Sequence, residues 1–223
     1  NQLNAYGRSL LPAENDVIVS WLPLYHDMGL IAGFLMPILA GIPLVIMSPF
    51  DWVRAPYRLL QSVSKYRGTL TWLPNFAYNF CAQKIRDRHI EGVDLSCLRG
   101  IINCSEPVRW ESHVAFYERF KGYGLKFEAL QTSYAMAENV FGVTQSKLGT
   151  APVVEEIDRE AFMGERLAMS PLDGRPAMKM MSSGQPIENT QVKVLDEKGS
   201  EVPERVIGEL ALKSDCMLTG YYN

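Results

Sequence analysis

Apolar stretches of strand length alternate with segments of helical length through the first two thirds of the chain. The clearest apolar stretch, 17–22, is nearly continuous, which is typical of a strand covered on both faces. Strands alternating with helices of this length indicate βαβ units, so we expect an α/β fold with a mostly parallel sheet flanked by helices. The expected strands are 17–22, 43–47, 68–73, 98–103 and 125–130, and the expected helices are 3–10, 28–40, 51–66, 76–88 and 109–123.

The pattern changes after Gly149. Residues 151–181 mix charged residues, methionine, proline and glycine without clear periodicity, which suggests an inserted segment that lies on the surface. From Gln191 apolar and polar residues alternate, and the alternation returns at 208–213, which predicts an antiparallel hairpin. We therefore expect an α/β subdomain at 1–149, an insertion-like segment at 150–183, and the start of a smaller antiparallel β-subdomain at 184–223 that ends abruptly, as a truncated domain would.

Composition places the chain among ordinary globular proteins. It has 223 residues, of which 47% are hydrophobic and 21% are charged, enough to bury a sizeable core. The net charge of −3 and the absence of a dense Lys/Arg cluster argue against nucleic acid or an anionic membrane as a partner. The apolar stretch 28–47 is interrupted by glycine and proline, so we expect a buried helix and strand there and no membrane span. Four widely spaced cysteines and the lack of a signal peptide favour free thiols and a cytoplasmic location.

Four polar clusters follow expected strands directly. Ligands of open parallel sheets bind beyond the carboxyl ends of the strands, so these clusters should meet at one edge and form a composite site. In the last cluster, an aromatic ring suits contact with a flat ligand, and a carboxylate suits a metal–phosphate group. The clusters are Tyr25-His26-Asp27, Pro74-Asn75, Ser105-Glu106-Pro107, and Ser133 to Glu138.

Several residues of these clusters also fit a purely structural role. His26 suits a hydrogen-bonded structural residue about as well as a ligand contact. Asp27 and Asn75 are plausible N-caps for the helices that follow them. Glu106 is as favourable near a helix N-terminus as against a ligand.

The chain lacks the GxxxxGK[ST], GxSxG and HExxH motifs, which argues against a self-sufficient nucleotide hydrolase or a serine hydrolase. The remaining histidines, His89 and His113, lie in hydrophilic helical stretches and are expected to be solvated.

Six segments, in order along the chain, resemble the core motifs of adenylate-forming enzymes. The forms Tyr-His-Asp-Met-Gly-Leu and Pro-Asn-Phe-Ala-Tyr are most similar to those of fatty acyl-AMP ligases. The segment 156–184 resembles the extra segment that separates fatty acyl-AMP ligases from fatty acyl-CoA ligases. The six segments are 20–30, 74–78, 103–108, 133–138, 184–186 and 208–223.

The resemblance implies a reaction in two steps. A fatty acid reacts with Mg-ATP to give an acyl-adenylate, and the acyl group then passes to a phosphopantetheine thiol. The acceptor is an acyl carrier protein in the acyl-AMP ligases and coenzyme A in the alternative, a fatty acyl-CoA ligase. An alternative of another class is a non-catalytic acyl- or nucleotide-binding module, and a third is a structural interaction domain.

The family's phosphate loop should precede Asn1, and its ribose-binding aspartate and lysine-bearing domain should follow Asn223. We therefore expect an internal piece of the large domain that does not form acyl-adenylate alone.

The resemblance also implies roles for individual residues. His26 would lie near the reacting carboxylate, Glu138 would hold Mg²⁺, and the ring of Tyr134 would stack on the adenine of ATP or AMP. The other implied contacts are Ser105, Glu106 and Pro107 beside the adenine; Ser133, Ala135 and Met136 near the phosphate and acyl carbonyl; and Asn75 and Phe76 in the acyl tunnel wall.

Overall fold

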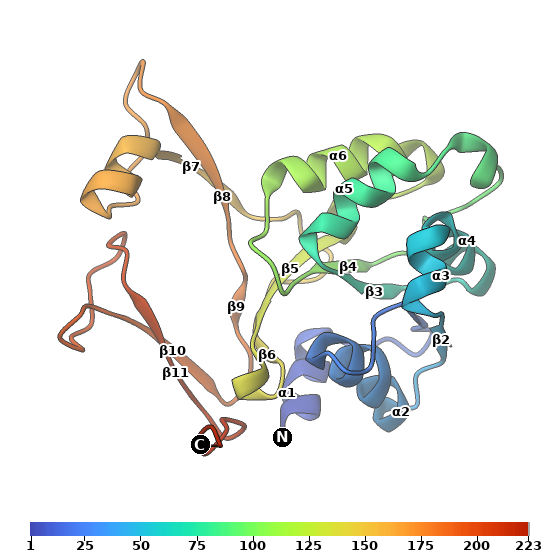
Figure 1. The fold of residues 1–223 in the computed structure, drawn as a ribbon, viewed down its shortest axis with the longest axis horizontal. Coiled ribbons are helices and arrows are strands. Elements are labelled where there is room, and N and C mark those ends of the chain that lie inside the picture. Colours follow the sequence, from blue (N-terminus) through green and yellow to red (C-terminus); the bar gives the residue numbers. More distant parts are fainter. Residues whose placement is uncertain (223) are drawn as a thin grey trace.

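A seven-stranded sheet with the order β2-β1-β3-β4-β5-β6-β9 forms the centre of the computed structural model, which describes residues 1–222 (Figure 1). Neighbouring strands from β2 to β5 are parallel, whereas β6 pairs antiparallel with both β5 and β9. The expected α/β fold with a mostly parallel sheet is confirmed. The strands are β1 (Ile18–Ser20), β2 (Leu44–Ile46), β3 (Leu70–Leu73), β4 (Gly100–Asn103), β5 (Leu130–Ala135), β6 (Gly142–Gln145) and β9 (Gln185–Pro186).

Helices cover both faces of this sheet. In Figure 1, α5 (Asn75–Lys84) and α6 (Trp110–Phe120) lie on one face, and α1 (Gln2–Ser9) and α2 (Met36–Ala40) lie on the other. A π-helix, η1 (Met28–Leu35), leads into α2, which ends at the left-handed Gly41 with φ of 68°. None of the helices within residues 1–222 is both long and apolar enough to cross a bilayer. The remaining helices are α3 (Pro49–Arg54), α4 (Tyr57–Tyr66), η2 (Asp87–His89), η3 (Lys121–Tyr123), η4 (Phe127–Ala129), η5 (Ala137–Asn139) and η6 (Ala161–Glu165).

Aromatic side chains hold α1 and α3 against the sheet. The Tyr6 hydroxyl accepts from Trp72 Nε1 at 2.8 Å and donates to Gln145 Oε1 at 2.9 Å, so α1 is tied to both β3 and β6. Trp21, just after β1, stacks on Trp52 of α3 with 3.7 Å between the ring centroids. These contacts fix the elements that precede and follow β1.

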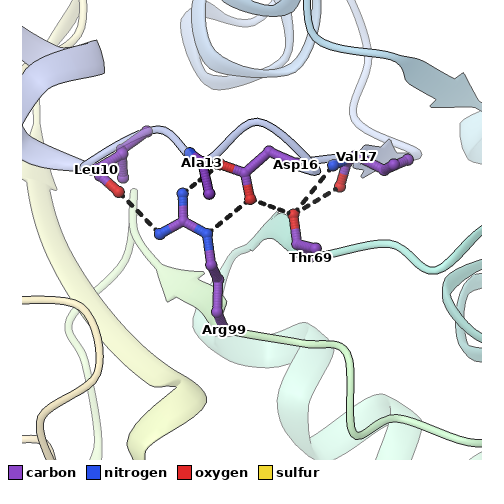
Figure 2. Close-up of polar contacts among 6 residues, drawn as sticks. All are labelled: Leu10, Ala13, Asp16, Val17, Thr69 and Arg99. Carbon is purple, nitrogen blue, oxygen red and sulfur yellow. Dashed lines mark hydrogen bonds and ion pairs between the residues drawn. The ribbon is translucent and has the colours of Figure 1, made fainter.

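A buried ion pair joins the amino-terminal ends of three strands (Figure 2). Asp16 is 1% exposed, and its Oδ1 accepts from Arg99 Nε and from Thr69 Oγ1, both at 2.7 Å. Burial raises the pKa of the Asp16 carboxyl, but hydrogen bonds from Arg99, Ala13 and Thr69 together hold it below its ordinary value. Arg99 Nη1 also donates to the carbonyl of Leu10 at 2.9 Å. The cluster therefore joins the end of α1 to the starts of β1, β3 and β4.

Two smaller antiparallel sheets accompany the main sheet. The predicted hairpin is confirmed as β10 (Thr190–Leu195) paired with β11 (Glu209–Ser214). A second pair, β7 (Val154–Asp158) with β8 (Ala177–Met181), lies within the stretch predicted to lack periodic structure. The side chain of Arg205 connects the two sheets, because it donates to Glu155 Oε1 and to the carbonyl of Ala168, both at 2.7 Å.

Several expected elements differ from the structure, among them the helix expected at 28–40, which is η1 followed by α2, and the helix expected at 76–88, which ends at Lys84. The helix expected at 51–66 is divided into α3 and α4, because Pro56 cannot supply the N–H that a continuous helix needs there. The strand expected at 125–130 is wrong, since η4 occupies 127–129 and β5 begins only at Leu130. Asn75 is the first residue of α5 and not its N-cap, which is Pro74. The four cysteines are free, as expected.

Candidate functional site

Three of the four polar clusters follow the ends of neighbouring strands, and the fourth, Ser133 to Glu138, begins within the last residues of β5. β1 ends at Ser20, β3 at Leu73, β4 at Asn103 and β5 at Ala135. Because these strands are adjacent and parallel in the order β1-β3-β4-β5, the segments that follow them leave the same edge of the sheet. The structure therefore brings the predicted clusters to one edge, opposite the edge that carries Asp16 and Arg99.

A cavity of about 310 Å³, called here the rim cavity, lies at this carboxyl-terminal edge. Its walls come from the turn after β4, from the end of β5 and from the segment before β9. Six of the residues predicted for the site line it together, whereas His26, Asn75, Phe76, Met136 and Glu138 do not. The lining residues are Ser105, Glu106, Pro107, Val108, Ser133, Tyr134, Ala135 and Ser183.

Tyr134 was expected in a turn after the strand, but it lies within β5 and reaches the rim cavity from there. Ser133 is buried and donates to the carbonyl of Thr144 at 2.7 Å, so the strand alternation turns the neighbouring Tyr134 outward. Tyr134 is 36% exposed, and its backbone N–H donates to Thr144 Oγ1 at 3.2 Å. A partly exposed ring on a fixed strand can lie flat against an aromatic ligand.

Sequence reasoning missed Ser183 as a residue of this cavity. Thr144 Oγ1 donates to the Ser183 carbonyl at 2.5 Å, which holds the segment against β6. The close approach depends on Gly184, where an added Cβ would lie 2.1 Å from the Gln145 carbonyl carbon and where φ is 90°. The glycine after two serines is the signal in the sequence that marks this approach.

The turn from Cys104 to Val108, called here the Ser-Glu-Pro turn, forms the opposite wall. Ser105 has φ of 70°, in the left-handed region that is uncommon for residues other than glycine. Glu106 Oε2 accepts from the Phe76 N–H at 2.7 Å. Glu106 was expected either near a helix N-terminus or against a ligand. The structure places it at the N-terminus of α5, and not at that of α6, which follows the turn.

His26 and Asp27 form a partly exposed pair after β1. His26 Nδ1 lies 2.7 Å from Asp27 Oδ1 and accepts from the Met28 N–H at 3.2 Å. Asp27 also accepts from the Met28 N–H at 2.7 Å, which confirms it as the N-cap of η1. Ser105 Oγ contacts Met28 Sδ at 3.7 Å, so this segment adjoins the Ser-Glu-Pro turn.

Glu138 lies in η5, just beyond the end of β5. Its carboxylate accepts from the Tyr221 hydroxyl, and this hydrogen bond holds the pKa of Glu138 below its ordinary value. The Glu138 carbonyl also accepts from the Leu218 N–H at 2.8 Å. Among residues 1–222 no group of three or more His, Cys, Asp or Glu side chains could form a metal site by itself. A single exposed carboxylate fits a Mg²⁺ ion that takes its other ligands from nucleotide phosphates and water.

Asn75 and Phe76 differ in their surroundings. Asn75 is 6% exposed, and both of its side-chain polar atoms bond to protein groups. Phe76 is 47% exposed and packs edge-on against Trp21 and Trp52, with centroid separations of 6.4 and 6.1 Å. Only Phe76 therefore offers an accessible apolar surface.

His113 corrects an expectation, because it is fully buried and not solvated. Its ring stacks on Tyr78 of α5 with 4.9 Å between centroids, and burial lowers its pKa to about 4. The imidazole is therefore neutral near pH 7. His113 Nε2 lies 3.1 Å from the side-chain nitrogen of Asn103, which is the last residue of β4. His113 therefore packs against the strand end that precedes the Ser-Glu-Pro turn.

Comparison with known proteins agrees with this arrangement. A profile described as "AMP-binding enzyme" matches residues 2–222. A putative fatty-acid–CoA ligase of Mycobacterium tuberculosis, FadD25, is 35% identical over 97% of this chain, which spans 36% of that relative. A probable long-chain-fatty-acid–AMP ligase of the same organism, FadD30, is 31% identical over 97% of the chain, which spans 37% of it.

A crystal structure of a fatty acid AMP ligase from Legionella pneumophila superimposes with a TM-score of 0.94 and 35% identity. The superposition covers 100% of this chain and 39% of the Legionella chain. A second Legionella structure with the same score contains acyl adenylate and pyrophosphate. The α/β fold of this chain is therefore that of a fatty acid AMP ligase. The chain belongs to the family of AMP-binding enzymes, and it spans little more than a third of the length of the relatives it matches.

Proposed function

We propose that the full-length protein activates a fatty acid with ATP to form an acyl-adenylate. The observation that carries the proposal is the rim cavity, where the Ser-Glu-Pro turn and the end of β5 face one another across one pocket. Both relatives named above are fatty-acid ligases, and the Legionella relative has been crystallised with an acyl adenylate.

In this proposal Tyr134 stacks on the adenine, and Ser105, Glu106 and Pro107 line the other side of the base. The shared cavity supports this pairing, because its two walls carry these residues. Ser133, Ala135 and Met136 belong near the phosphate and the acyl carbonyl. Ser133 is largely buried and already donates to the Thr144 carbonyl, so its contribution comes through the strand that it fixes.

The chemical step joins a carboxylate oxygen of the fatty acid to the α-phosphorus, while the bond from that phosphorus to the pyrophosphate oxygen breaks. Such in-line displacement depends on positioning and on neutralising charge. Mg²⁺, when bound with ATP, supplies much of the neutralisation, and Glu138 would hold it. His26 would lie near the reacting carboxylate, and its ring is already oriented by Asp27. The resemblance implies that Asn75 and Phe76 belong to the acyl tunnel wall, and the exposed ring of Phe76 suits that role.

The acyl group would then pass to a phosphopantetheine thiol. An acyl carrier protein is the proposed acceptor, because the segment 156–184 resembles the extra segment of the acyl-AMP ligases, and coenzyme A is the alternative. A cytoplasmic location and the three-part division at 149 and 183 are likewise proposed.

The test uses the full-length protein and measures fatty-acid-dependent exchange of labelled pyrophosphate into ATP. We expect exchange with the unaltered protein, and a fall of about a hundredfold for Glu138→Ala and for His26→Ala, a size typical when one group that stabilises transition-state charge is removed. Glu91→Ala, an exposed carboxylate in a loop outside the site, is the matched control and should exchange normally.

Other results would favour the alternatives. Binding of AMP without any exchange would support a non-catalytic nucleotide-binding module. Acyl transfer to coenzyme A as fast as to a carrier protein would support an acyl-CoA ligase.

A further inference from the structure

The Ser-Glu-Pro turn is held at both ends by one buried side chain. Asn75 Oδ1 accepts from Asn103 Nδ2 at 3.1 Å and from the Arg109 N–H at 3.0 Å. Asn103 is the last residue of β4, and Arg109 is the N-cap of α6, so the two donors flank the turn on either side. A single amide oxygen therefore sets how far apart the ends of the turn lie.

The other half of the Asn75 amide is fixed as well. Its Nδ2 donates to Ser112 Oγ in the first turn of α6 at 3.1 Å. Asn103 in turn lies against His113 Nε2 at 3.1 Å, and both residues are fully buried. Because buried polar groups are costly when unpaired, these contacts restrain the amide of Asn75 to one orientation.

The turn needs such support because its backbone is strained. The left-handed φ of Ser105 is unfavourable for a residue with a Cβ and persists only when the surroundings impose it. The backbone N–H of the next residue, Phe76, donates to Glu106 Oε2 at 2.7 Å. Asn75 therefore bonds to both ends of the turn, and Phe76 bonds to its middle.

We propose that Asn75 is a positioning residue that sets the shape of the Ser-Glu-Pro wall of the rim cavity, and hence the affinity for the adenine of the nucleotide. The proposal rests on the proposed function, and it replaces the assignment of Asn75 to the acyl tunnel wall. Its burial and the use of both its polar atoms leave little of this side chain for an acyl chain.

The experiment compares Asn75→Ala with Asn79→Ala in the full-length protein. Asn79 lies one helical turn further along α5 and donates to the same Ser112 Oγ at 2.9 Å, but it makes no hydrogen bond to the turn. AMP affinity is measured by calorimetry, KM values are measured for ATP and fatty acid, and amide hydrogen exchange is followed in 104–109.

For Asn75→Ala we expect faster exchange in 104–109 and a rise of about tenfold in the Kd for AMP and the KM for ATP, which corresponds to about 1.4 kcal/mol. The KM for fatty acid and the preference for chain length should not change. Asn79→Ala should leave both nucleotide constants within about twofold, a change below about 0.5 kcal/mol, because the Asn79 side chain bonds to Ser112 and not to the turn.

A changed preference for chain length with unchanged AMP affinity would overturn the proposal and restore the tunnel role. If Asn75→Ala does not fold, Asn75→Asp tests the same point, because it keeps an acceptor for Asn103 and Arg109 and lets the Ser112 hydroxyl donate. Asn75→Asp should bind AMP more tightly than any folded variant that lacks the acceptor, such as Asn75→Leu, and equal affinity for the two would contradict the proposal. Faster exchange in 104–109 together with no nucleotide binding by the unaltered protein would show that the proposed function fails while the support of the turn stands.

Discussion

At the scale of single residues, Tyr221 lowers the pKa of Glu138, the carboxylate proposed to hold Mg²⁺. Its hydroxyl donates to Glu138, and a hydrogen bond to the ionised form lowers a carboxyl pKa. Tyr221→Phe should therefore raise the pKa of Glu138 towards its ordinary value of 4.5. A carbon-13 NMR titration of the Glu138 carboxyl measures this shift.

The matched control is Tyr222→Phe, because Tyr222 is fully exposed and makes no hydrogen bond to Glu138. The control should leave the Glu138 titration unchanged. An unchanged pKa in Tyr221→Phe would mean that the hydroxyl does not bond to Glu138 in solution.

Single residues also show what could be predicted from the sequence. Asp27 was predicted as an N-cap because that role depends only on the next few residues of its own helix. The burial of His113 could not be predicted, since it depends on Tyr78 of a different helix. The hydrogen bonds of Asn75 were missed for the same reason, because their partners follow 28 and 34 residues later.

At the scale of elements, Gly29 allows the start of η1 to pack closely against Pro23, in the loop that carries His26. A Cβ at Gly29 would lie 2.2 Å from the Pro23 carbonyl oxygen, an atom of the backbone that cannot move aside like a side chain. Gly29→Ala should lower the free energy of unfolding by about 1–3 kcal/mol, the usual cost of overpacking. Denaturant unfolding of the chain, followed by circular dichroism, measures the change.

Gly7→Ala provides the comparison, since Gly7 lies within α1 and an added Cβ would have no atom within 4 Å. Alanine favours a helix over glycine, so this variant should be more stable by about 0.5–1 kcal/mol. Equal effects of the two substitutions would show that the close approach of Gly29 does not determine its cost.

Most elements of the parallel part of the sheet were predicted, because a short apolar run between helices of ordinary length is a strong local signal. The strand expected at 125–130 failed because Phe127–Ala129 form a short 3-10 helix, and the alternating exposure of Lys126 and Glu128 does not distinguish that helix from a strand. The antiparallel additions β6 and β9 were not predicted, since β6 has a single aliphatic residue, Val143, and β9 is Gln185–Pro186, so neither contains an apolar run.

At the scale of the whole molecule, the Asp16–Arg99 pair should make stability depend on pH. The folded-state pKa of Asp16 lies below its ordinary value of 3.8, so its contribution is fully present above about pH 4. The contribution is lost as the pH falls through the lowered folded-state pKa. Arg99→Met, which leaves a buried carboxylate without its cation, should cost about 3 kcal/mol at pH 7 and weaken this acid dependence.

Unfolding of the chain between pH 2 and 7 measures both effects. Arg8→Ala breaks an ion pair with Glu188 in which both side chains are well exposed, and it should cost at most about 1 kcal/mol. A loss in Arg99→Met no larger than that in Arg8→Ala would show that the cluster does not stabilise the sheet.

The contacts of Arg205 predict that the stretch 159–176 is held by the β10–β11 sheet. Arg205→Gln removes the bonds to Glu155 and Ala168 while the backbone bridge between Leu167 and Val206 remains. Amide hydrogen exchange should become faster in 159–176 and stay the same in β3 and β4. Lys193→Gln, which breaks an exposed pair with Glu201, should change neither region.

The ion pair of Figure 2 and the rim cavity lie at opposite ends of the same strands. Selection can therefore act on the two ends separately. Substitutions in the exposed loops after β1, β4 and β5 can alter which ligand is bound, while the Asp16–Arg99 ion pair at the other end of the strands stabilises the sheet. A mutant library confined to those loops should retain a high proportion of folded members, which makes this chain a favourable starting point for laboratory evolution of new specificities.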